Sequence, residues 1–156
     1  MGFFEGCFAC FVALYGILKP QKGIFIMVGI VVVSHSQKLA EGVVELAKLM
    51  AGDANIVAAG GLDDGQAGTS FEKIMSAVEE VHEEDGVAVL MDMGSAVMTT
   101  EMVIEALGYD DVVMLDGPIV EGAIVAALES ALGTPLEKLQ AKVDEARETR
   151  KLDLTK

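Results

Sequence analysis

An unbroken apolar run, Gly-Ile-Val-Val-Val at residues 29–33, is the feature that most limits what this chain can fold into. A continuous run of β-branched residues is typical of a strand that is buried on both faces, as in a parallel sheet. Ser34, His35 and Ser36 follow it directly, and a helical pattern begins at residue 38. Because open α/β sheets bind ligands at the carboxyl ends of their strands, His35 lies where such a site would form. An imidazole there, between two hydroxyls and at a helix amino terminus, is suited to bind an anion or to carry a phosphoryl group.

Strand and helix patterns alternate along the rest of the chain, with short breaks between them. The patterns predict strands at residues 28–34, 55–59, 87–91 and 112–115, and helices at residues 38–50, 71–81, 95–107, 119–132 and 135–149. This repetition predicts an α/β fold: a doubly wound, mainly parallel four-stranded sheet of order 2-1-3-4 with helices on both faces. In that order the first and third strands are central neighbours, and their carboxyl ends border one crevice.

Helical spacing and local chemistry suggest roles for several other side chains. On the first helix, apolar residues recur at helical spacing: Leu39, Val43, Leu46, Ala47 and Met50. We interpret four methionines as core filling and interface rather than as metal ligands: Met91, Met93, Met98 and Met102. Ser95 is expected to cap the helix at 95–107, and Thr134-Pro135 to start the last helix as cap and first-turn proline. His82, on a charged helix, is expected to be a solvated surface residue.

The acidic composition excludes some classes of partner. There are 25 Asp and Glu residues against 11 Lys and Arg, which gives a formal net charge of −14. A surface of that sign repels nucleic acid and anionic membranes. It suits a basic protein partner, or it only keeps the protein in solution.

Cys7 and Cys10 form a C-x-x-C pair, but neither further metal ligands nor a βαβ start surrounds them, and nothing argues for an oxidising compartment.

The first 26 residues differ in composition from the rest of the chain. They hold most of the Phe residues and both Cys, but only three charged residues: Glu5, Lys19 and Lys22. The apolar stretch from Cys7 to Leu18 is too short to span a bilayer, and no basic residue precedes it as a signal peptide requires. Our preferred hypothesis is that residues 1–26 are an atypical extension that is not native, with Met27 as the natural start. The alternative is a short hydrophobic helix that docks on a partner or on a membrane surface. Residues 27–150 would then form the domain, and residues 151–156 a C-terminal tail.

Polar groups follow three of the predicted strands, at His35, Asp92 and Asp116. His35 and Asp92 would face each other at the crevice between the first and third strands. A carboxylate that is hydrogen-bonded to one imidazole nitrogen fixes the tautomer and leaves the other nitrogen free as a nucleophile. The competing interpretations are that His35 only caps or packs, and that Asp92 is a plain helix cap. Asp116, before Gly-Pro, is more typical of a turn former than of an active group.

A glycine-rich loop at residues 60–68 links the second strand to its helix. Its four glycines and two aspartates exclude regular structure, and loops of that length in compact domains are often functional. Backbone N–H groups at Thr69-Ser70 and at Gly94-Ser95, each at a predicted helix amino terminus, would hold phosphate oxygens. Neither a Walker-type lysine motif nor G-x-G-x-x-G follows the first strand, which argues against the usual modes of nucleotide binding.

Three motifs, taken in order, are specific to one known family. They are V-V-S-H-S-x-x-L-A-E-G-V (residues 32–43), G-G-L-D-D-G-Q-A-G-T-S (residues 60–70) and M-D-M-G-S-A (residues 91–96). From Met27 to about Arg150, the chain resembles the phosphotransfer subunits of phosphoenolpyruvate-dependent dihydroxyacetone kinases, which are built on the mannose-type enzyme IIA fold.

The resemblance implies a role for each candidate residue. His35 would take phosphate from the phosphocarrier protein HPr and pass it to ADP held on the nucleotide-binding subunit of the kinase, while a third subunit binds dihydroxyacetone. Asp92 would orient His35, and Thr69, Gly94 and Ser95 would support the phosphate. The resemblance also implies a cytoplasmic homodimer without a metal or a permanently bound cofactor, since the phosphate is carried covalently on His35. Neither nucleic-acid binding nor stable membrane insertion is expected.

Two departures from the family and two alternative functions bear on this interpretation. Some relatives fuse HPr-like and enzyme I-like domains behind this one, so we expect separate donor proteins here. The N-terminal extension is also outside the family pattern.

One alternative function is that of the enzyme IIA of a mannose-type sugar transporter. Those domains tend to carry G-G-S-P after the third-strand aspartate, where this chain has Met93-Gly94-Ser95-Ala96. The other is a non-catalytic binding or regulatory module in which His35 only contacts a ligand.

Overall fold

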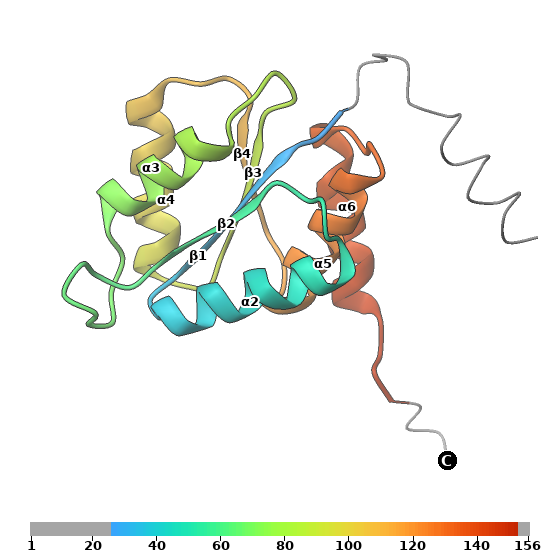
Figure 1. Ribbon diagram of the computed structural model, residues 1–156, viewed down its shortest axis with the longest axis horizontal. Coiled ribbons are helices and arrows are strands. Elements are labelled where there is room, and N and C mark those ends of the chain that lie inside the picture. Colours follow the sequence, from blue (N-terminus) through green and yellow to red (C-terminus); the bar gives the residue numbers. More distant parts are fainter. Residues whose placement is uncertain (1–25, 153–156) are drawn as a thin grey trace, which may run out of the picture.

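Four parallel strands form a single sheet, and helices pack on both of its faces (Figure 1). The structure is a computed structural model that describes residues 26–152. The strands are β1 (Gly29–Ser34), β2 (Ile56–Gly60), β3 (Val87–Met91) and β4 (Val112–Leu115). The helices are α2 (Gln37–Met50), α3 (Phe71–Val81), α4 (Ser95–Leu107), α5 (Ile119–Ala131) and α6 (Leu136–Glu148). The strand order β2-β1-β3-β4 confirms the predicted doubly wound α/β fold.

The proposed extension at residues 1–26 lies outside the described residues, except for Ile26. Its interpretation therefore stays a prediction, as do the domain boundaries.

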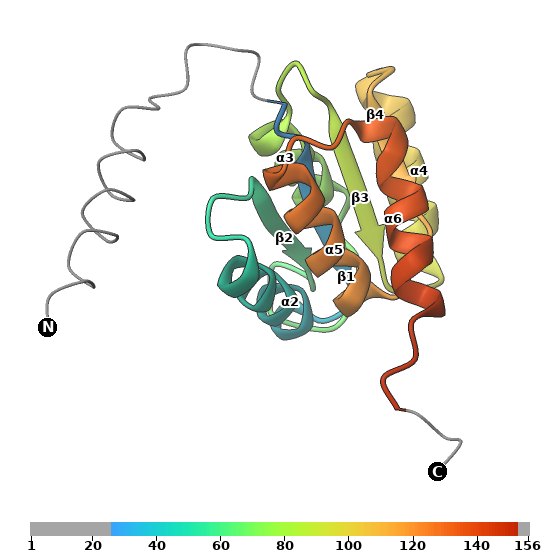
Figure 2. The ribbon, with the colours of Figure 1, turned by 90° about the vertical axis from the view of Figure 1, so that its right-hand side faces the viewer.

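β1 lies in the middle of the sheet, and its side chains alternate between the two faces. Val32 pairs with Leu90 of β3 in the parallel register. Ile30 and Val32 enter the apolar cluster beneath α2, α5 and α6, whereas Val31 and Val33 enter the cluster beneath α3 and α4. Figure 2 shows α2, α5 and α6 together on one face of the sheet. All four β1 side chains are fully buried, and burial of each stabilises the fold by about 1.5–3 kcal/mol. This double burial explains why the run contains no polar position.

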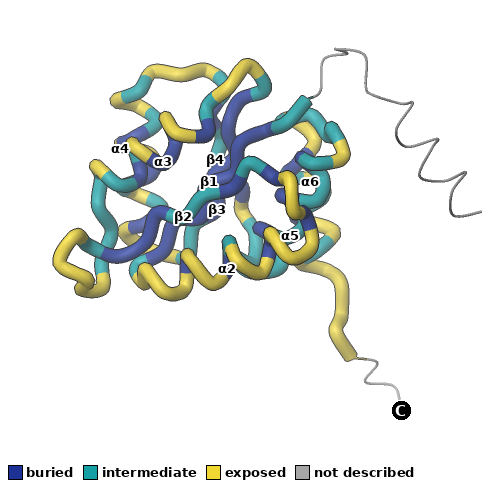
Figure 3. The backbone as a smooth tube through the Cα atoms, viewed as in Figure 1, coloured by how far each residue is buried: buried dark blue, intermediate teal, exposed yellow. Residues whose placement is uncertain are grey.

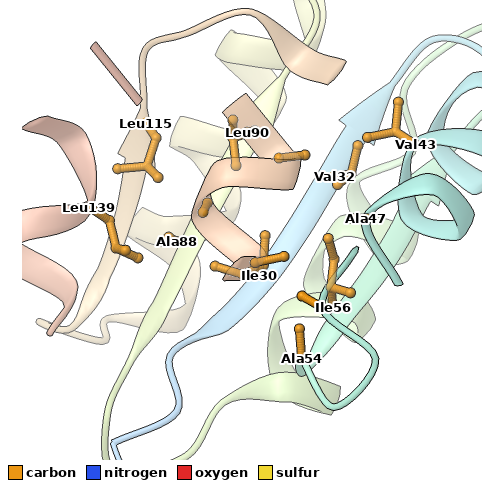
Figure 4. Close-up of a cluster of buried hydrophobic side chains, with 14 of the residues drawn as sticks. Ile30, Val32, Val43, Ala47, Ala54, Ile56, Ala88, Leu90, Leu115 and Leu139 are labelled. Atoms are coloured by element: carbon orange, nitrogen blue, oxygen red, sulfur yellow. The ribbon is translucent and has the colours of Figure 1, made fainter. Parts of the chain in front are cut away.

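Aliphatic side chains from the sheet and from three helices fill the larger cluster (Figure 4). Ile30, Ile56, Leu90 and Leu139 are its largest buried members. The buried hydroxyl of Ser130 on α5 is satisfied, because it donates to the Val28 carbonyl at 2.7 Å. α5 thus packs against β1 and is also hydrogen-bonded to the residue that precedes this strand.

The helix α2 buries its small residues rather than its largest ones. Leu39 and Leu46 are 40% and 41% exposed, and Met50 is 61% exposed. The residues that α2 buries are Ala40, Val43 and Ala47. Because these side chains are short, the helix lies close to the sheet, and residues at the edge of its apolar stripe stay outside the contact. Helical spacing therefore predicts the helix, but not which of its apolar residues are buried.

The methionines of the β3–α4 segment are mostly on the surface. Met93, Met98 and Met102 are 69%, 64% and 59% exposed, so they do not fill the core as predicted, and their interpretation as interface residues stays a prediction. Only Met91 is half-buried, packed against the cluster beneath α3 and α4. The core-facing side of α4 is formed by other residues: Ala96, Thr100 and Val103. In Figure 3 the central strands β1 and β3 are mostly buried, while the outer faces of the helices and much of the glycine-rich loop are exposed.

The start of α6 differs from the prediction. Its N-cap is Pro135, with no capping hydrogen bond from a side chain, and the helix begins at Leu136. Thr134 does not cap, because its hydroxyl donates instead to Glu129 of α5 at 2.6 Å.

Among residues 26–152, no helix has the length and apolar character needed to cross a membrane.

Candidate active site

His35 lies in the turn between β1 and α2, directly after the buried strand. Ser36 caps α2, since its Oγ accepts a hydrogen bond from the Leu39 N–H at 3.3 Å. The Oγ of Ser34 accepts from the Ser36 N–H at 3.0 Å and donates to Asp92 Oδ2 at 2.9 Å. The two serines therefore fix the turn, while the side chain of His35 remains 34% exposed.

The carboxylate of Asp92 accepts four hydrogen bonds. Oδ2 accepts from the Ser34 hydroxyl and from the His35 N–H, each at 2.9 Å. Oδ1 accepts from His35 Nδ1 at 2.9 Å and from the Met93 N–H at 2.6 Å. Burial by itself would raise the pKa of Asp92, but these hydrogen bonds outweigh burial and lower the pKa below its ordinary value. Asp92 is therefore ionised at neutral pH, and it is not a plain helix cap.

The charge of Asp92 determines the tautomer of His35. A carboxylate can only accept hydrogen bonds, so Nδ1 carries the proton of the neutral ring and Nε2 holds a lone pair. The Ser95 Oγ lies 2.8 Å from Nε2 and donates to it. Of the two ring nitrogens, Nε2 is the one available to react.

A turn at Gly94 positions the Ser95 hydroxyl. Gly94 is the N-cap of α4, so the prediction that Ser95 caps this helix is wrong. Gly94 has φ 53° and ψ −117°, and the Ala96 N–H donates to the Met93 carbonyl at 3.1 Å. This is a type II′ turn, whose first central position favours glycine. Ser95 thus becomes the first helical residue, with its side chain directed at the imidazole instead of at the helix end.

The glycine-rich loop is bonded to the turn that carries His35. The Gly61 N–H donates to the Ser34 carbonyl at 3.1 Å, and the Gly68 N–H donates to the His35 carbonyl at 2.9 Å. Ser70, at the end of the loop, caps α3, because its Oγ accepts from the Lys73 N–H at 3.3 Å. Two backbone hydrogen bonds therefore join the loop to the His35 turn.

Lys73, which the sequence analysis did not single out, holds the loop from the opposite side. Its Nζ donates to the Leu62 carbonyl at 3.0 Å and to the Gly60 carbonyl at 3.4 Å, and it lies 3.7 Å from Asp63 Oδ1. The feature of the sequence that could have indicated this role is a lysine in the first turn of a helix that follows a glycine-rich loop.

Thr69 and Thr99 extend the contacts of Ser95. Thr69 Oγ1 lies 3.3 Å from Ser95 Oγ and 3.2 Å from Thr99 Oγ1. Thr69 was predicted for the site, but Thr99 was not. Thr99 follows Ser95 by four residues, so both side chains lie on the same face of α4. That spacing is the feature of the sequence that could have identified Thr99.

An open cavity of about 390 Å³ adjoins the imidazole. It is lined by the start of α2 and by the glycine-rich loop: His35, Ser36, Gln37, Lys38, Glu41, Gly65, Gln66 and Ala67. The ring is therefore accessible from the surface of the molecule.

Two other polar residues lie outside this site. Asp116 is tied to α6, because its carboxylate and its carbonyl both contact Arg147, at 2.9 and 2.7 Å. His82 was expected to be a solvated surface residue, but its Nε2 lies 2.8 Å from Asp111 Oδ1 and its ring stacks on Tyr109.

Within residues 26–152, no three His, Cys, Asp or Glu side chains are grouped so that they could hold a metal ion.

Comparison with known proteins gives a match over most of the described chain. A family model described as "PTS system fructose IIA component" (EIIA-man) matches residues 29–140. The phosphoryl donor subunit DhaM of the PEP-dependent dihydroxyacetone kinase of Escherichia coli (strain K12) is 42% identical over 120 residues, which are 72% of this chain and 25% of that protein. This chain therefore spans a quarter of the E. coli relative.

Two shorter relatives are covered almost completely. The phosphoryl donor subunit DhaM of PEP-dependent dihydroxyacetone kinase 1 of Listeria innocua is 36% identical over 74% of this chain and 91% of its own length. The phosphotransferase subunit DhaM of the PTS-dependent dihydroxyacetone kinase of Lactococcus lactis is 34% identical over 74% of this chain and 93% of its own. A crystal structure described as unknown function protein EF1359 matches with a TM-score of 0.69 and 25% identity, over 81% of this chain and 99% of that one.

His35 and Asp92 lie together at the ends of the two central strands of a parallel sheet, and the family model matches most of the chain. The chain therefore belongs to the mannose-type enzyme IIA family, the PTS fructose IIA components. Within that family it groups with the DhaM subunits.

Proposed function

We propose that this chain is a phosphohistidine carrier. It accepts a phosphoryl group on His35 from HPr, ultimately from phosphoenolpyruvate, and passes it to ADP bound on the nucleotide-binding subunit of a dihydroxyacetone kinase. The observation that carries the proposal is the partly exposed imidazole of His35, whose Nδ1 is held by Asp92 at 2.9 Å so that the lone pair lies on Nε2, where it contacts the Ser95 hydroxyl. The names of the relatives as phosphoryl donor subunits support it.

In the first transfer, Nε2 of His35 attacks the phosphorus of the donor's phosphohistidine. A new N–P bond forms at Nε2 while the donor's N–P bond breaks, and the donor's nitrogen recovers its electron pair. Because Nδ1 keeps its proton, the ring of His35 gains positive charge, which the Asp92 carboxylate stabilises. The Ser95 hydroxyl has to leave Nε2, since it occupies the direction from which the phosphorus approaches.

In the second transfer, an oxygen of the terminal phosphate of ADP attacks the same phosphorus. The N–P bond at Nε2 breaks, a P–O bond forms and ATP is produced, while Nε2 regains its lone pair. Between the two transfers, the hydroxyls of Ser95 and Thr69 support the phosphoryl oxygens. The backbone N–H groups at Gly94 and Ser95 also support them, because the first N–H groups of an α-helix have no partner within the helix.

The carrier meets its partners through the edge of the sheet at which the strands end. The exposed side chain of Met93, next to Asp92 in the chain, offers an apolar contact, and the net charge of −14 favours partners with a basic surface. We further propose that the carrier is a cytoplasmic homodimer that holds no cofactor permanently and carries phosphate only as phosphohistidine.

Phosphorylation of the purified chain tests this function. Incubation with phosphoenolpyruvate, enzyme I and HPr should place one acid-labile phosphate on the wild-type chain, and mass spectrometry should locate it at His35. The labelled chain is then offered ADP on the kinase subunit, or a sugar-specific enzyme IIB. Transfer to ADP supports the proposal, and transfer only to enzyme IIB replaces it with the sugar-transport alternative. A wild-type chain that takes up no phosphate is a binding module.

A further inference from the structure

Three hydroxyl groups form a row that begins at the reactive nitrogen of His35. Ser95 Oγ lies 2.8 Å from Nε2, Thr69 Oγ1 lies 3.3 Å from Ser95 Oγ, and Thr99 Oγ1 lies 3.2 Å from Thr69 Oγ1. Ser95 and Thr99 belong to α4, whereas Thr69 comes from the end of the glycine-rich loop. Two segments that lie far apart in the sequence are thus joined by hydroxyls beside the imidazole.

The tautomer of His35 gives this row one direction. A hydroxyl has a single proton to donate. Ser95 donates its proton to Nε2, so toward Thr69 it can only accept. Thr69 therefore donates to Ser95 and can only accept from Thr99. All three protons point toward the imidazole, because Asp92 keeps the ring proton on Nδ1 at the other side.

We propose that Thr99 is a positioning residue of the phosphotransfer site. It touches neither the imidazole nor the phosphoryl group, but its proton holds the Thr69 hydroxyl as a donor toward Ser95. This inference depends on the proposed function for its kinetic consequences, although the direction of the hydrogen bonds does not.

The consequence appears when Nε2 becomes phosphorylated. The lone pair of Nε2 is then used in the N–P bond, and the new acceptors at this place are the phosphoryl oxygens. The Ser95 hydroxyl then moves off Nε2, but Ser95 and Thr69 already present their protons on this side, so neither hydroxyl has to reverse its direction. Donors that are oriented before the reaction stabilise developing charge without a cost of reorganisation. Without Thr99, the Thr69 hydroxyl loses one of its two partners and is held beside Ser95 only by the 3.3 Å contact between their oxygens.

The test compares two variants of adjacent threonines. Thr99→Val removes the last hydroxyl of the row while it keeps the shape of the side chain. Thr100→Val is the matched control: Thr100 is buried on the same helix, and its hydroxyl donates to the Ala96 carbonyl at 2.7 Å, away from the row. For Thr99→Val we expect kcat for phosphorylation by HPr to fall about three- to tenfold, with KM for HPr unchanged, since one hydrogen bond is lost. Thr99→Ser should restore kcat, and Thr100→Val should leave it unchanged.

A measurement without phosphate separates this inference from the proposed function. The nitrogen chemical shift of Nε2 in the free protein reports the hydrogen bond from Ser95, so it should move in Thr99→Val and stay in Thr100→Val. If wild-type chain is never phosphorylated but this shift moves, the proposed function fails, while the orientation of the Ser95 and Thr69 hydroxyls by Thr99 holds. If wild-type chain is phosphorylated and Thr99→Val matches it in both kcat and the Nε2 shift, the positioning role is wrong.

Discussion

Nδ1 of His35 and Oδ1 of Asp92 lie 2.9 Å apart, although the two residues are 57 positions apart in the chain. The contact exists because β1 and β3 are adjacent parallel strands, with Val33 opposite Met91, so that both leave the sheet at the same edge. Backbone groups secure it: the Asp92 N–H donates to the Val33 carbonyl at 3.1 Å, and the His35 N–H donates to Asp92 Oδ2 at 2.9 Å. The pair is therefore held by the sheet as well as by its side chains.

The two histidines should behave differently when each is replaced by alanine. His35→Ala should abolish acid-labile labelling, because the accepting nitrogen is gone. His82→Ala should still be labelled, but its free energy of unfolding should fall by about 1–2 kcal/mol, since it loses the bond to Asp111 and the stack on Tyr109. Phosphate incorporation and urea unfolding measure the two effects. Labelling of His35→Ala would show that the phosphate resides elsewhere.

Asp92→Asn should slow phosphorylation without unfolding the protein. An amide can donate or accept, so it no longer holds the proton on Nδ1, and it brings no charge to balance the phosphorylated ring. Loss of a hydrogen bond to a charged group corresponds to about a 10- to 100-fold slower transfer. Rapid-quench measurement of phosphate uptake from HPr gives this rate. An unchanged rate would remove Asp92 from the mechanism.

Acid should destabilise the wild-type protein more than the Asp92→Asn variant. The pKa of Asp92 is lower in the folded protein than its ordinary value, which applies in the unfolded chain. Its contribution to stability is therefore complete above the ordinary pKa and is lost as the pH falls through the folded value. Below about pH 4, the difference in unfolding free energy between wild type and variant should shrink. Denaturant unfolding from pH 7 to pH 2 tests this, and a constant difference would contradict it.

Gly94→Ala should damage the site, whereas Gly108→Ala should only reduce stability. Gly94 has φ 53° and directs the Ser95 hydroxyl to His35, while Gly108, with φ 65°, ends the same helix far from the site. Both variants should lose about 1–2 kcal/mol of unfolding free energy, because alanine is strained at positive φ. Only Gly94→Ala should also lower the phosphorylation rate of the folded protein. Equal rates in both variants would mean that the turn does not position Ser95.

Lys73→Met should loosen the glycine-rich loop. Methionine keeps the apolar stem but cannot donate to the carbonyls of Leu62 and Gly60. Hydrogen exchange at the amides of Gly61 and Gly68 should accelerate by about three- to tenfold, because the loop opens more often. Lys48→Met, at an exposed lysine in the last turn of α2, is the control and should leave both amides unchanged. Unchanged exchange in Lys73→Met would show that the loop is held by its other bonds.

Much of the site can be predicted from local sequence, because its elements depend on local properties. The run at residues 29–33 has no polar position, which predicts a doubly buried strand, and the order of strands and helices then places His35 opposite Asp92. The exposure of apolar side chains on the helices was predicted less well. Helical spacing identifies an apolar stripe, but how much of that stripe is buried depends on how closely the helix approaches the sheet. Leu46 and Met98 are exposed for that reason.

The amino-acid sequence by itself determined the parallel sheet, the place of His35 at the end of its central strand and the carboxylate that faces it. The strands follow from the period of the apolar residues within each segment, and the order of the strands follows from their alternation with helices along the chain. Only the tertiary structure decided that Ser95 donates to Nε2, that Thr69 and Thr99 extend this bond, and that Lys73 holds the loop. Those contacts depend on the turn at Gly94 and on how two separate segments meet, and a hydrogen bond forms only when both of its atoms are brought within about 3 Å.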